Sequence, residues 1–377
     1  MKIFAISTCL IPSDTANSIQ VMKACQGLVQ LGHKVTLLVP GKKTSNASQQ
    51  ALASHYGLAT PFEVVHIPAA SRRVFTLSAV RRAKHFGAEL LYIWPAQSAV
   101  FGQIAGLPVI LELHDLPTGN FGPLWFRFFL YGGGHKRLLL ITTALRQALE
   151  RELHINLGNQ DVLIAPNGVD LERFANLPEA GKARSQIGLP DSHTVICTGH
   201  LYAGRGADLF LTLASDLRET NFFWVGGRSQ DVTEWKNRAA AQGLDNVTFT
   251  GFVPNEILPL YQAAADILLM PYGRIIGISS GIGRSAEVSS PMKMFEYMAA
   301  GRTILTSDLP VLREVLDEST AVFCPPEDAT AWSAAIKSLL GNPTRRISLG
   351  QHARQAVERY TWIERARRAL AGFEGQE

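Results

Sequence analysis

The feature that most constrains this chain is an alternation of short apolar runs, rich in Val, Ile and Leu, with helix-length amphipathic segments. Parallel strands covered on both faces read as nearly continuous apolar runs of this kind. We predict seven strands in the first half, at 2–7, 34–40, 63–68, 90–95, 108–114, 138–143 and 161–166. Asn17–Leu31 shows helical apolar spacing, and Gly32 follows as a helix stop. The alternation favours right-handed βαβ units on an open parallel sheet.

The same plan restarts after a break at 175–192, which is rich in Pro, Gly and polar residues and reads as a linker. Six further strands are predicted at 193–199, 222–227, 246–251, 266–271, 302–307 and 320–325. The segment 360–373 reads as a basic amphipathic helix that is free to pack back on the first domain. We therefore predict an α/β chain of two Rossmann-like domains, 1–178 joined by the C-terminal helix 360–377, and 179–359.

The bulk composition agrees with two packed domains and excludes some function classes. A chain of 377 residues, 46% hydrophobic and 18% charged, is too long for one ordinary core and is not disordered. A net charge of +4 does not indicate a nucleic-acid binder. Residues 1–180 carry 16 basic against 11 acidic side chains, and the densest basic stretch holds Arg72, Arg73, Arg81, Arg82, Lys84, Arg127, Lys136 and Arg137. Such a face is either merely solvated or a docking face for anionic lipid.

The cysteines and the N-terminus bear on the compartment. Cys9, Cys25, Cys197 and Cys324 lack metal-type spacing, which indicates buried thiols in a reducing compartment. The apolar run after Lys2 has no small-residue cleavage site, so it reads as a strand and not as a signal peptide. No window reaches 18 uncharged apolar residues. We expect a cytoplasmic protein, peripheral at the inner face of the membrane if its basic face binds lipid.

Ligands of open α/β sheets bind at the carboxyl ends of the strands, so the residues just after the predicted strands are the first candidates. The loop 7–18 ends in Asn17 and Ser18, where helix N–H groups could face an anion; simple capping by these side chains is the alternative. His114 and Asp115 end another strand. They could orient a ligand hydroxyl or move a proton, or they could be structural.

Two glycine-containing segments follow strands of the second half. In GHLYAGRG (199–206), His200 and Arg205 flank a turn that leads into a helix, and a cation beside free helix N–H groups suits a diphosphate. An ordinary βα turn with a surface arginine is the alternative. In WVGG, Gly226 and Gly227 would allow close backbone approach to a ligand.

The segment 289–310 carries the strongest signal. Ser289 and Ser290 precede a helix in which Lys293 and Glu296 lie three residues apart, on one face. A lysine beside phosphate and a glutamate that accepts from a ribose diol would form a nucleotide clamp, whereas the helix dipole explains only the glutamate. The sequence has no GxxxxGK[ST] loop, no complete GxGxxG after a strand and no DxD-like pair after a strand, so we do not expect a metal site.

These segments, in this order, resemble the retaining GT-B glycosyltransferases of family 4, also called glycosyl transferases group 1. The resemblance covers nearly the whole chain, and its most specific part is APNGVDLERF (165–174) followed by KMFEYMAAG (293–301). Further matching segments are 32–40, 112–117, 141–149, 199–206, 224–227, 251–267, 289–310 and 360–366. The resemblance implies two Rossmann-like domains facing across a central cleft, the first for the acceptor and the second for a nucleotide-sugar donor.

The resemblance also implies roles for single residues. His114 matches the family histidine near the donor sugar. His200 and Arg205 match the two cationic positions at the donor diphosphate, although Arg205 stands where lysine is usual and its planar fork differs from an ammonium group. Glu296 matches the second glutamate of the E-x7-E pair, which holds the ribose hydroxyls.

This chain departs from the family pattern at two places. The first glutamate of the E-x7-E pair would fall at Val288, with Glu287 one place earlier, which leaves the geometry at the donor sugar open. The Gly-Gly of the first loop is replaced by Asp14–Asn17. We assign catalytic roles to His114 and Glu287, diphosphate binding to His200, Arg205, Lys293, Ser289 and Ser290, nucleoside binding to Glu296, Gly226 and Gly227, and an acceptor or phosphate loop to Asn17 and Ser18.

The function implied is a metal-independent retaining hexosyltransferase, with a nucleotide-sugar as co-substrate, no other cofactor and no nucleic-acid partner. A GT-B epimerase or hydrolase, or a non-catalytic sugar-nucleotide binding protein, is the alternative. The expected acceptor is a sugar or a lipid-linked molecule of polysaccharide or glycolipid biosynthesis. The segments 72–84 and 125–140 would form the lipid-facing surface, although Leu138–Leu140 fit a buried strand better.

Overall fold

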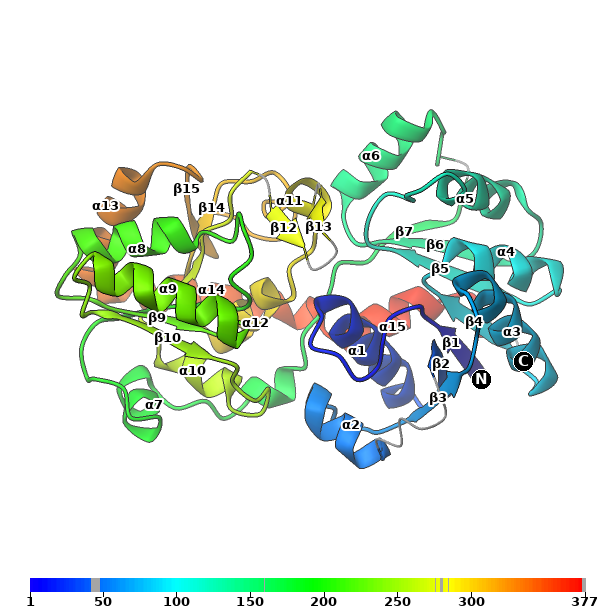
Figure 1. Cartoon of the computed structure of the whole chain (residues 1–377), viewed down its shortest axis with the longest axis horizontal. Coiled ribbons are helices and arrows are strands. Elements are labelled where there is room, and N and C mark those ends of the chain that lie inside the picture. The colour runs from blue at the N-terminus through cyan, green and yellow to red at the C-terminus, as the bar shows by residue number, and fades with distance from the viewer. Residues whose placement is uncertain (42–47, 159, 275, 279–280, 284, 375–377) are drawn as a thin grey trace. The chain divides into compact units, whose positions relative to one another are not determined.

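The computed structural model describes residues 1–41, 48–158, 160–274, 276–278, 281–283 and 285–374 (Figure 1). The chain divides into two compact units, Met1–Gly168 with Trp362–Glu377, and Val169–Thr361. Each unit is built on one parallel sheet flanked by helices, which confirms the prediction of two Rossmann-like units.

The first unit holds a seven-stranded parallel sheet in the order β3-β2-β1-β4-β5-β6-β7. Its strands are β1 (Lys2–Ile6), β2 (Lys34–Pro40), β3 (Glu63–Ile67), β4 (Leu90–Ile93), β5 (Val109–Leu113), β6 (Lys136–Leu140) and β7 (Val162–Ile164). Its helices are α1 (Ala16–Gln30), α2 (Gln49–Tyr56), α3 (Arg72–His85), α4 (Ala96–Ile104), α5 (Gly122–Tyr131), α6 (Thr143–Leu153) and α15 (Trp362–Leu370). All seven predicted strands are present, but β6 begins and ends two to three residues earlier than predicted.

The second unit holds a six-stranded parallel sheet in the order β10-β9-β8-β11-β14-β15. Its strands are β8 (Thr194–Thr198), β9 (Asn221–Val225), β10 (Val247–Gly251), β11 (Ile267–Met270), β14 (Thr303–Ser307) and β15 (Ala321–Cys324). Its helices are α7 (Ala180–Gln186), α8 (Ala207–Asp216), α9 (Ser229–Ala241), α10 (Leu258–Ala264), α11 (Ser285–Val288), α12 (Met292–Ala300), α13 (Ala329–Leu340) and α14 (Pro343–Ala356), with two short 3₁₀ turns, Leu171–Phe174 and Val357–Tyr360.

Two elements of the second unit were not predicted. The predicted linker 175–192 contains α7, whose Arg184 is buried and reaches Asp266 at 3.3 Å, so this stretch is part of the packed unit. A small antiparallel hairpin, β12 (Ile276–Ile278) with β13 (Gly281–Gly283), follows β11. Its short, glycine-rich strands lack the long apolar runs on which the strand prediction rested.

The C-terminal helix α15 packs against α1 within the first unit. Gly27 of α1 makes this possible, because a Cβ atom there would lie 2.5 Å from the carbonyl oxygen of Trp362. Backbone therefore meets backbone at this contact, which a larger residue would push apart. Because α15 packs this closely, one of its arginines, Arg365, is buried in the core.

The four cysteines are free and buried, as predicted. Burial raises the pKa of the Cys9, Cys25 and Cys197 thiols, and raises that of Cys324 to about 11. These thiols are therefore protonated at neutral pH, which suits a packing role. Within the described ranges, no helix combines the length and apolar character that crossing a bilayer requires.

Candidate functional site

Two cationic side chains of the second unit converge on the ring of Tyr272, just beyond the carboxyl end of β11. Lys293 Nζ lies 4.6 Å from the centroid of this ring, and the Arg205 guanidinium carbon lies 5.2 Å from it. Arg205 Nη1 also donates a hydrogen bond of 3.2 Å to the Tyr272 hydroxyl. Both cations are within range of cation–π attraction. A buried tyrosine therefore gathers two like charges from distant segments at the end of the sheet.

No carboxylate that the structure describes neutralises either of these cations. Among the described residues, no Asp or Glu oxygen lies within 4.0 Å of Arg205 or Lys293. Lys293 Nζ donates instead to the carbonyl oxygen of Thr198, at 3.1 Å. The Nε atom of Arg205 is buried, and no described residue accepts a hydrogen bond from it. Neighbouring cations without a counter-charge attract an anion, and a guanidinium group matches phosphate oxygens.

The turn that carries Arg205 is fixed by a glycine. Gly206 has φ of +87°, and a Cβ atom there would lie 1.9 Å from the carbonyl oxygen of Pro271. The same two turns are joined by a hydrogen bond of 2.9 Å from Gly273 N to the carbonyl oxygen of Gly204. Only glycine permits this approach, so the glycine-bracketed sequence brings the turn after β8 onto the turn after β11. That packing brings Arg205 to its aromatic partner.

Lys293 is seated by a second buried tyrosine. The Tyr297 hydroxyl accepts a hydrogen bond of 2.7 Å from Thr198 N and lies 3.1 Å from Thr198 Oγ1. Burial raises the pKa of Tyr297 well above its ordinary value, so the hydroxyl stays protonated. Lys293 and Tyr297 lie four residues apart on α12, one turn of the helix. The bond therefore anchors the first turns of α12 against the end of β8.

Glu296 reaches a different neighbour from Lys293. Its Oε2 accepts a hydrogen bond of 3.1 Å from Nε2 of Gln262, a fully buried residue of α10. Among the side chains that the structure describes, Lys293 and Glu296 form no ion pair with each other. The half-buried carboxylate of Glu296 keeps further acceptor capacity, because an ionised carboxylate has about four lone-pair sites.

The glycines of WVGG are required by packing. Gly226 has φ of +114°, and a Cβ atom there would lie 2.8 Å from the carbonyl oxygen of Gly199. A Cβ atom on Gly227, with φ of +105°, would lie 2.9 Å from Cδ1 of Leu201. The contact between the turns after β8 and β9 thus accounts for both glycines, and a nucleoside role for them stays a prediction.

The other predicted residues of this unit are spread over two segments. The His200 ring stacks on Tyr202, with centroids 5.0 Å apart. Before α12, Ser290 is buried and Ser289 is half-buried. The side chain of Glu287 is exposed, whereas Val288 is 3% exposed, so the position that the resemblance reserves for a glutamate is a packed valine. The catalytic role of Glu287 stays a prediction.

In the first unit, His114 follows β5 and is bonded to a carboxylate within that strand. His114 Nε2 lies 2.5 Å from Oε1 of Glu112, and the two side chains are 24% and 0% exposed. The side chain of the adjacent Asp115 bonds to the backbone instead, since its Oδ1 accepts a hydrogen bond of 2.7 Å from Leu116 N. His114 is therefore held by Glu112 and not by its neighbour Asp115.

The loop before α1 is satisfied by its own side chains. Thr15 caps α1, because its hydroxyl accepts a hydrogen bond of 3.3 Å from Ser18 N. The Ser18 hydroxyl donates to the carbonyl oxygens of Ser13 and Thr15, at 2.6 and 2.9 Å, and Asn17 is exposed. The expectation that Asn17 or Ser18 caps this helix is wrong, because the helix begins earlier, at Ala16. Their binding role stays a prediction.

Sequence reasoning missed three residues that organise these sites: Tyr272, Glu112 and Arg365. Two of them left a signal. Glu112 is a lone acidic residue inside an otherwise apolar strand, which predicts a buried charge with a partner. Arg365 lies in the helical stripe of Trp362, Ala366 and Ala369, all of them buried. Tyr272 left no signal in the sequence, because its role depends on the contact between the turns after β8 and β11.

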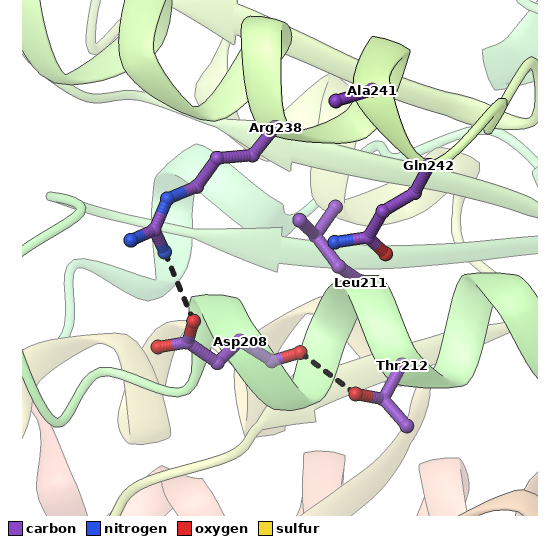
Figure 2. A pocket seen from close by; sticks show the side chains of 6 residues that line it. All are labelled: Asp208, Leu211, Thr212, Arg238, Ala241 and Gln242. Atoms are coloured by element: carbon purple, nitrogen blue, oxygen red, sulfur yellow. Dashed lines mark hydrogen bonds and ion pairs between the residues drawn. The ribbon is translucent and has the colours of Figure 1, made fainter.

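The recess drawn in Figure 2 lies away from the strand ends, between α8 and α9. Its volume is about 310 Å³, and Arg238 Nη1 pairs across it with Oδ1 of Asp208 at 3.0 Å. Because these charges satisfy each other, the recess has no free charge for an anion. Among the described residues, no group of three or more His, Cys, Asp or Glu side chains could hold a metal ion.

Comparison with known proteins places part of the chain in a described family. Residues 192–342, in the second unit, match the family described as glycosyl transferases group 1. The chain is 29% identical, over 218 residues, to the GDP-mannose-dependent alpha-(1-6)-phosphatidylinositol monomannoside mannosyltransferase of Mycolicibacterium smegmatis. This match covers 56% of each chain, so it spans little more than half of that relative's length.

Two further proteins are similar over most of the chain. The phosphatidyl-myo-inositol mannosyltransferase of Mycolicibacterium smegmatis is 24% identical over 357 residues, which cover 91% of this chain and 85% of that protein. The solved structure of sucrose-phosphate synthase from Thermosynechococcus elongatus superposes with a TM-score of 0.74 at 19% identity, covering 97% of this chain and 96% of that one. At this level of identity the structural likeness shows the fold alone.

Proposed function

Because this chain belongs to the group 1 glycosyl transferases of GT-B fold, we propose that it transfers a hexose from a nucleotide-diphosphate sugar to a lipid-linked acceptor. The observation that carries the proposal is the convergence of Arg205 and Lys293 on Tyr272 without a counter-charge among the described residues. A diphosphate supplies the missing negative charge. When its bond to the sugar breaks, the bonding electrons stay on the diphosphate and add to that charge. Cations fixed in advance favour that change.

The proposed reaction retains the anomeric configuration. The bond between the anomeric carbon and the diphosphate oxygen breaks while the acceptor hydroxyl bonds to the same carbon, from the same face. The acceptor proton passes to the departing diphosphate, which takes the bonding electrons. Arg205 and Lys293 stabilise that leaving group, Glu296 accepts from the ribose hydroxyls, and His114 accepts from a hydroxyl of the donor sugar. The cations make a metal ion unnecessary in this scheme.

GDP-mannose is the donor that we propose to test first, since the monomannoside mannosyltransferase of Mycolicibacterium smegmatis is GDP-mannose-dependent. The experiment measures thermal stabilisation by GDP-mannose, UDP-glucose and ADP-glucose in the presence of a chelator. A ligand at about 100 times its Kd stabilises a protein by about 2.7 kcal/mol, which is a clear shift in Tm. Transfer of mannose to phosphatidylinositol, followed by mass spectrometry, then tests the reaction. No shift with any donor would contradict the proposal.

A surface of the first unit supports a lipid-linked acceptor. On and just before α5, the exposed apolar residues Phe121, Leu124, Phe128 and Tyr131 recur at helical spacing, and together they form the α5 stripe. These side chains are 44% to 69% exposed, an unusual state for a regular apolar stripe on a helix. Amphipathic helices at a bilayer surface present this pattern.

The α5 stripe lies beside a basic helix. Helix α4 contacts both α3 and α5 (Figure 1). The Arg73 guanidinium carbon of α3 lies 5.1 Å from the centroid of the Phe121 ring. Five exposed basic side chains line α3: Arg72, Arg73, Arg81, Arg82 and Lys84. Exposed apolar and basic groups on one surface fit an anionic membrane. We therefore propose a cytoplasmic enzyme that meets its acceptor at the inner face of the membrane.

Part of the predicted basic face is internal. Lys136 Nζ donates to the carbonyl oxygens of Phe129 and Leu130, at 3.1 and 2.6 Å. Arg137 Nε pairs with Asp161 at 2.9 Å, and Leu138–Leu140 are buried in β6. These two cations therefore serve the fold, and the membrane surface that we propose consists of α3 and the α5 stripe.

A further inference from the structure

A buried carboxylate in β5 is the centre of a polar network behind His114. Glu112 is fully buried, and its Oε1 lies 2.5 Å from Gln20 Nε2, 2.5 Å from His114 Nε2 and 2.7 Å from Arg365 Nη2. Its Oε2 accepts hydrogen bonds from the Tyr92 hydroxyl and, at 3.0 Å, from Arg365 Nη1. Such a group costs free energy to bury unless it is paired, and here every partner is a donor.

The charge state of Glu112 fixes the proton on His114. Burial alone would raise the pKa of Glu112, but the Arg365 guanidinium, and then His114, hold it well below its ordinary value. An ionised carboxylate can only accept hydrogen bonds, so Nε2 of His114 must carry the hydrogen that it shares with Glu112. Nδ1 has no hydrogen-bond partner among the described residues, and the ring is 24% exposed. Nδ1 is thus the nitrogen left for a ligand.

Arg365 brings the C-terminal helix into this arrangement. Its Nε donates to the carbonyl oxygen of Pro166 at 2.9 Å, and its Nη2 donates to that of Ala165 at 3.2 Å. The guanidinium group therefore has carbonyl partners besides the carboxylate, which fix its plane. α15 is tied through one side chain to the strand that ends at His114.

We propose that Glu112, ion-paired with Arg365, is a positioning residue that holds a proton of His114 on Nε2 and fixes the ring so that Nδ1 is the nitrogen open to a sugar hydroxyl. This inference rests on the proposed function for the identity of the ligand, but the position of the proton is independent of it. A carboxylate behind a functional histidine commonly sets its tautomer and orientation in this way.

The test compares two variants that both remove bonds of Glu112. The double variant Glu112→Met/Arg365→Met removes both charges together with the acceptor oxygens of residue 112, and it leaves no unpaired buried ion, which protects the fold. The matched control Tyr92→Phe removes a bond to Oε2 but leaves Oε1 with His114. The protein has ten histidines, so the His114 signal in ¹⁵N-histidine-labelled samples is identified by its loss in His114→Ala.

We expect an exchange-protected Nε2–H resonance of His114 in the native protein and in Tyr92→Phe, and its loss in the double variant. Absence of this resonance from the native protein, or its survival unchanged in the double variant, would overturn the proposal. Melting temperatures of both variants show that the comparison is made on folded protein.

A kinetic measurement tests the consequence for the ligand. With GDP-mannose as donor, the double variant should release GDP with a kcat reduced about 10- to 100-fold, as is typical when such a partner is removed, and with KM little changed. Native turnover in the double variant would overturn the positioning role. A native protein that releases no GDP would count against the proposed function alone, because the resonance still reports where the proton is.

Discussion

Arg365 of α15 and Glu112 of β5 form a fully buried ion pair, with Nη2 and Oε1 2.7 Å apart and the residues 253 positions apart in the sequence. The pair joins the two segments of the chain that make up the first unit, because α15 follows the entire second unit in the sequence and packs back on the first unit. It also stands directly behind His114. Stability of this unit and geometry of its candidate site therefore depend on the same two charges.

Removing one partner of this pair should be strongly destabilising. Arg365→Met leaves Glu112 buried without its counter-charge, and breaking a buried ion pair in this way typically costs about 3–5 kcal/mol. Arg367→Met is the matched control on the same helix, since its pair with Glu364 is exposed and such pairs contribute about 0.2–1 kcal/mol. Urea unfolding measures both variants. An equal loss in the free energy of unfolding for both variants would show that the buried pair contributes no more to stability than the exposed pair.

The same pair predicts a dependence of stability on pH. The pKa of Glu112 in the folded protein lies well below its ordinary value of 4.5, so folding is favoured by the ionised form. That contribution is complete above about pH 4.5 and is lost as the pH falls below it, because the unfolded chain then binds the proton first. The free energy of unfolding should therefore fall less steeply below pH 4.5 in Glu112→Met/Arg365→Met than in the native protein. Parallel pH profiles would contradict this account.

The turn that positions Arg205 should tolerate no side chain at Gly206. A Cβ atom there would lie 1.9 Å from a backbone oxygen, whereas a Cβ atom on Gly243, with φ of +62°, would meet no atom within 4 Å. Gly243→Ala should cost about 1 kcal/mol for its backbone conformation alone, and Gly206→Ala should cost clearly more. Urea unfolding separates the two. Similar costs would mean that the approach to Pro271 is not tight.

The α5 stripe should mediate binding to anionic bilayers. Phe121→Ser/Phe128→Ser should reduce co-sedimentation with vesicles that contain phosphatidylglycerol, and added salt should weaken binding by the native protein, because exposed charges are screened beyond about 8 Å at physiological ionic strength. Phe252→Ser, which removes an even more exposed aromatic residue from the second unit, is the control and should bind normally. Equal recovery of the native protein with neutral and anionic vesicles at low salt would favour a soluble acceptor.

How far the sequence predicts this molecule depends on the range of the interactions. The strands were predictable because each is an apolar run read locally. Arg205 was identifiable because it follows a strand of the second sheet, and Lys293 because it lies one helical turn from Glu296 on the same helix face. Their shared partner Tyr272 was not, since it depends on the packing of Gly206 against Pro271. The pairing of Glu112 with Arg365 was equally hidden, because no local pattern joins residues 253 positions apart.

The affinity for a nucleoside diphosphate, measured by calorimetry without metal, tests the central claim most directly. The comparison uses native protein, Arg205→Gln, and Arg238→Gln as a control whose charge is already paired with Asp208. Arg205→Gln should weaken GDP or UDP binding by about 1.5–3 kcal/mol, the worth of a charged hydrogen bond, which is roughly tenfold or more in Kd. It should leave binding of the bare nucleoside unchanged, and Arg238→Gln should behave as native. Unaltered diphosphate affinity in folded Arg205→Gln would contradict the account.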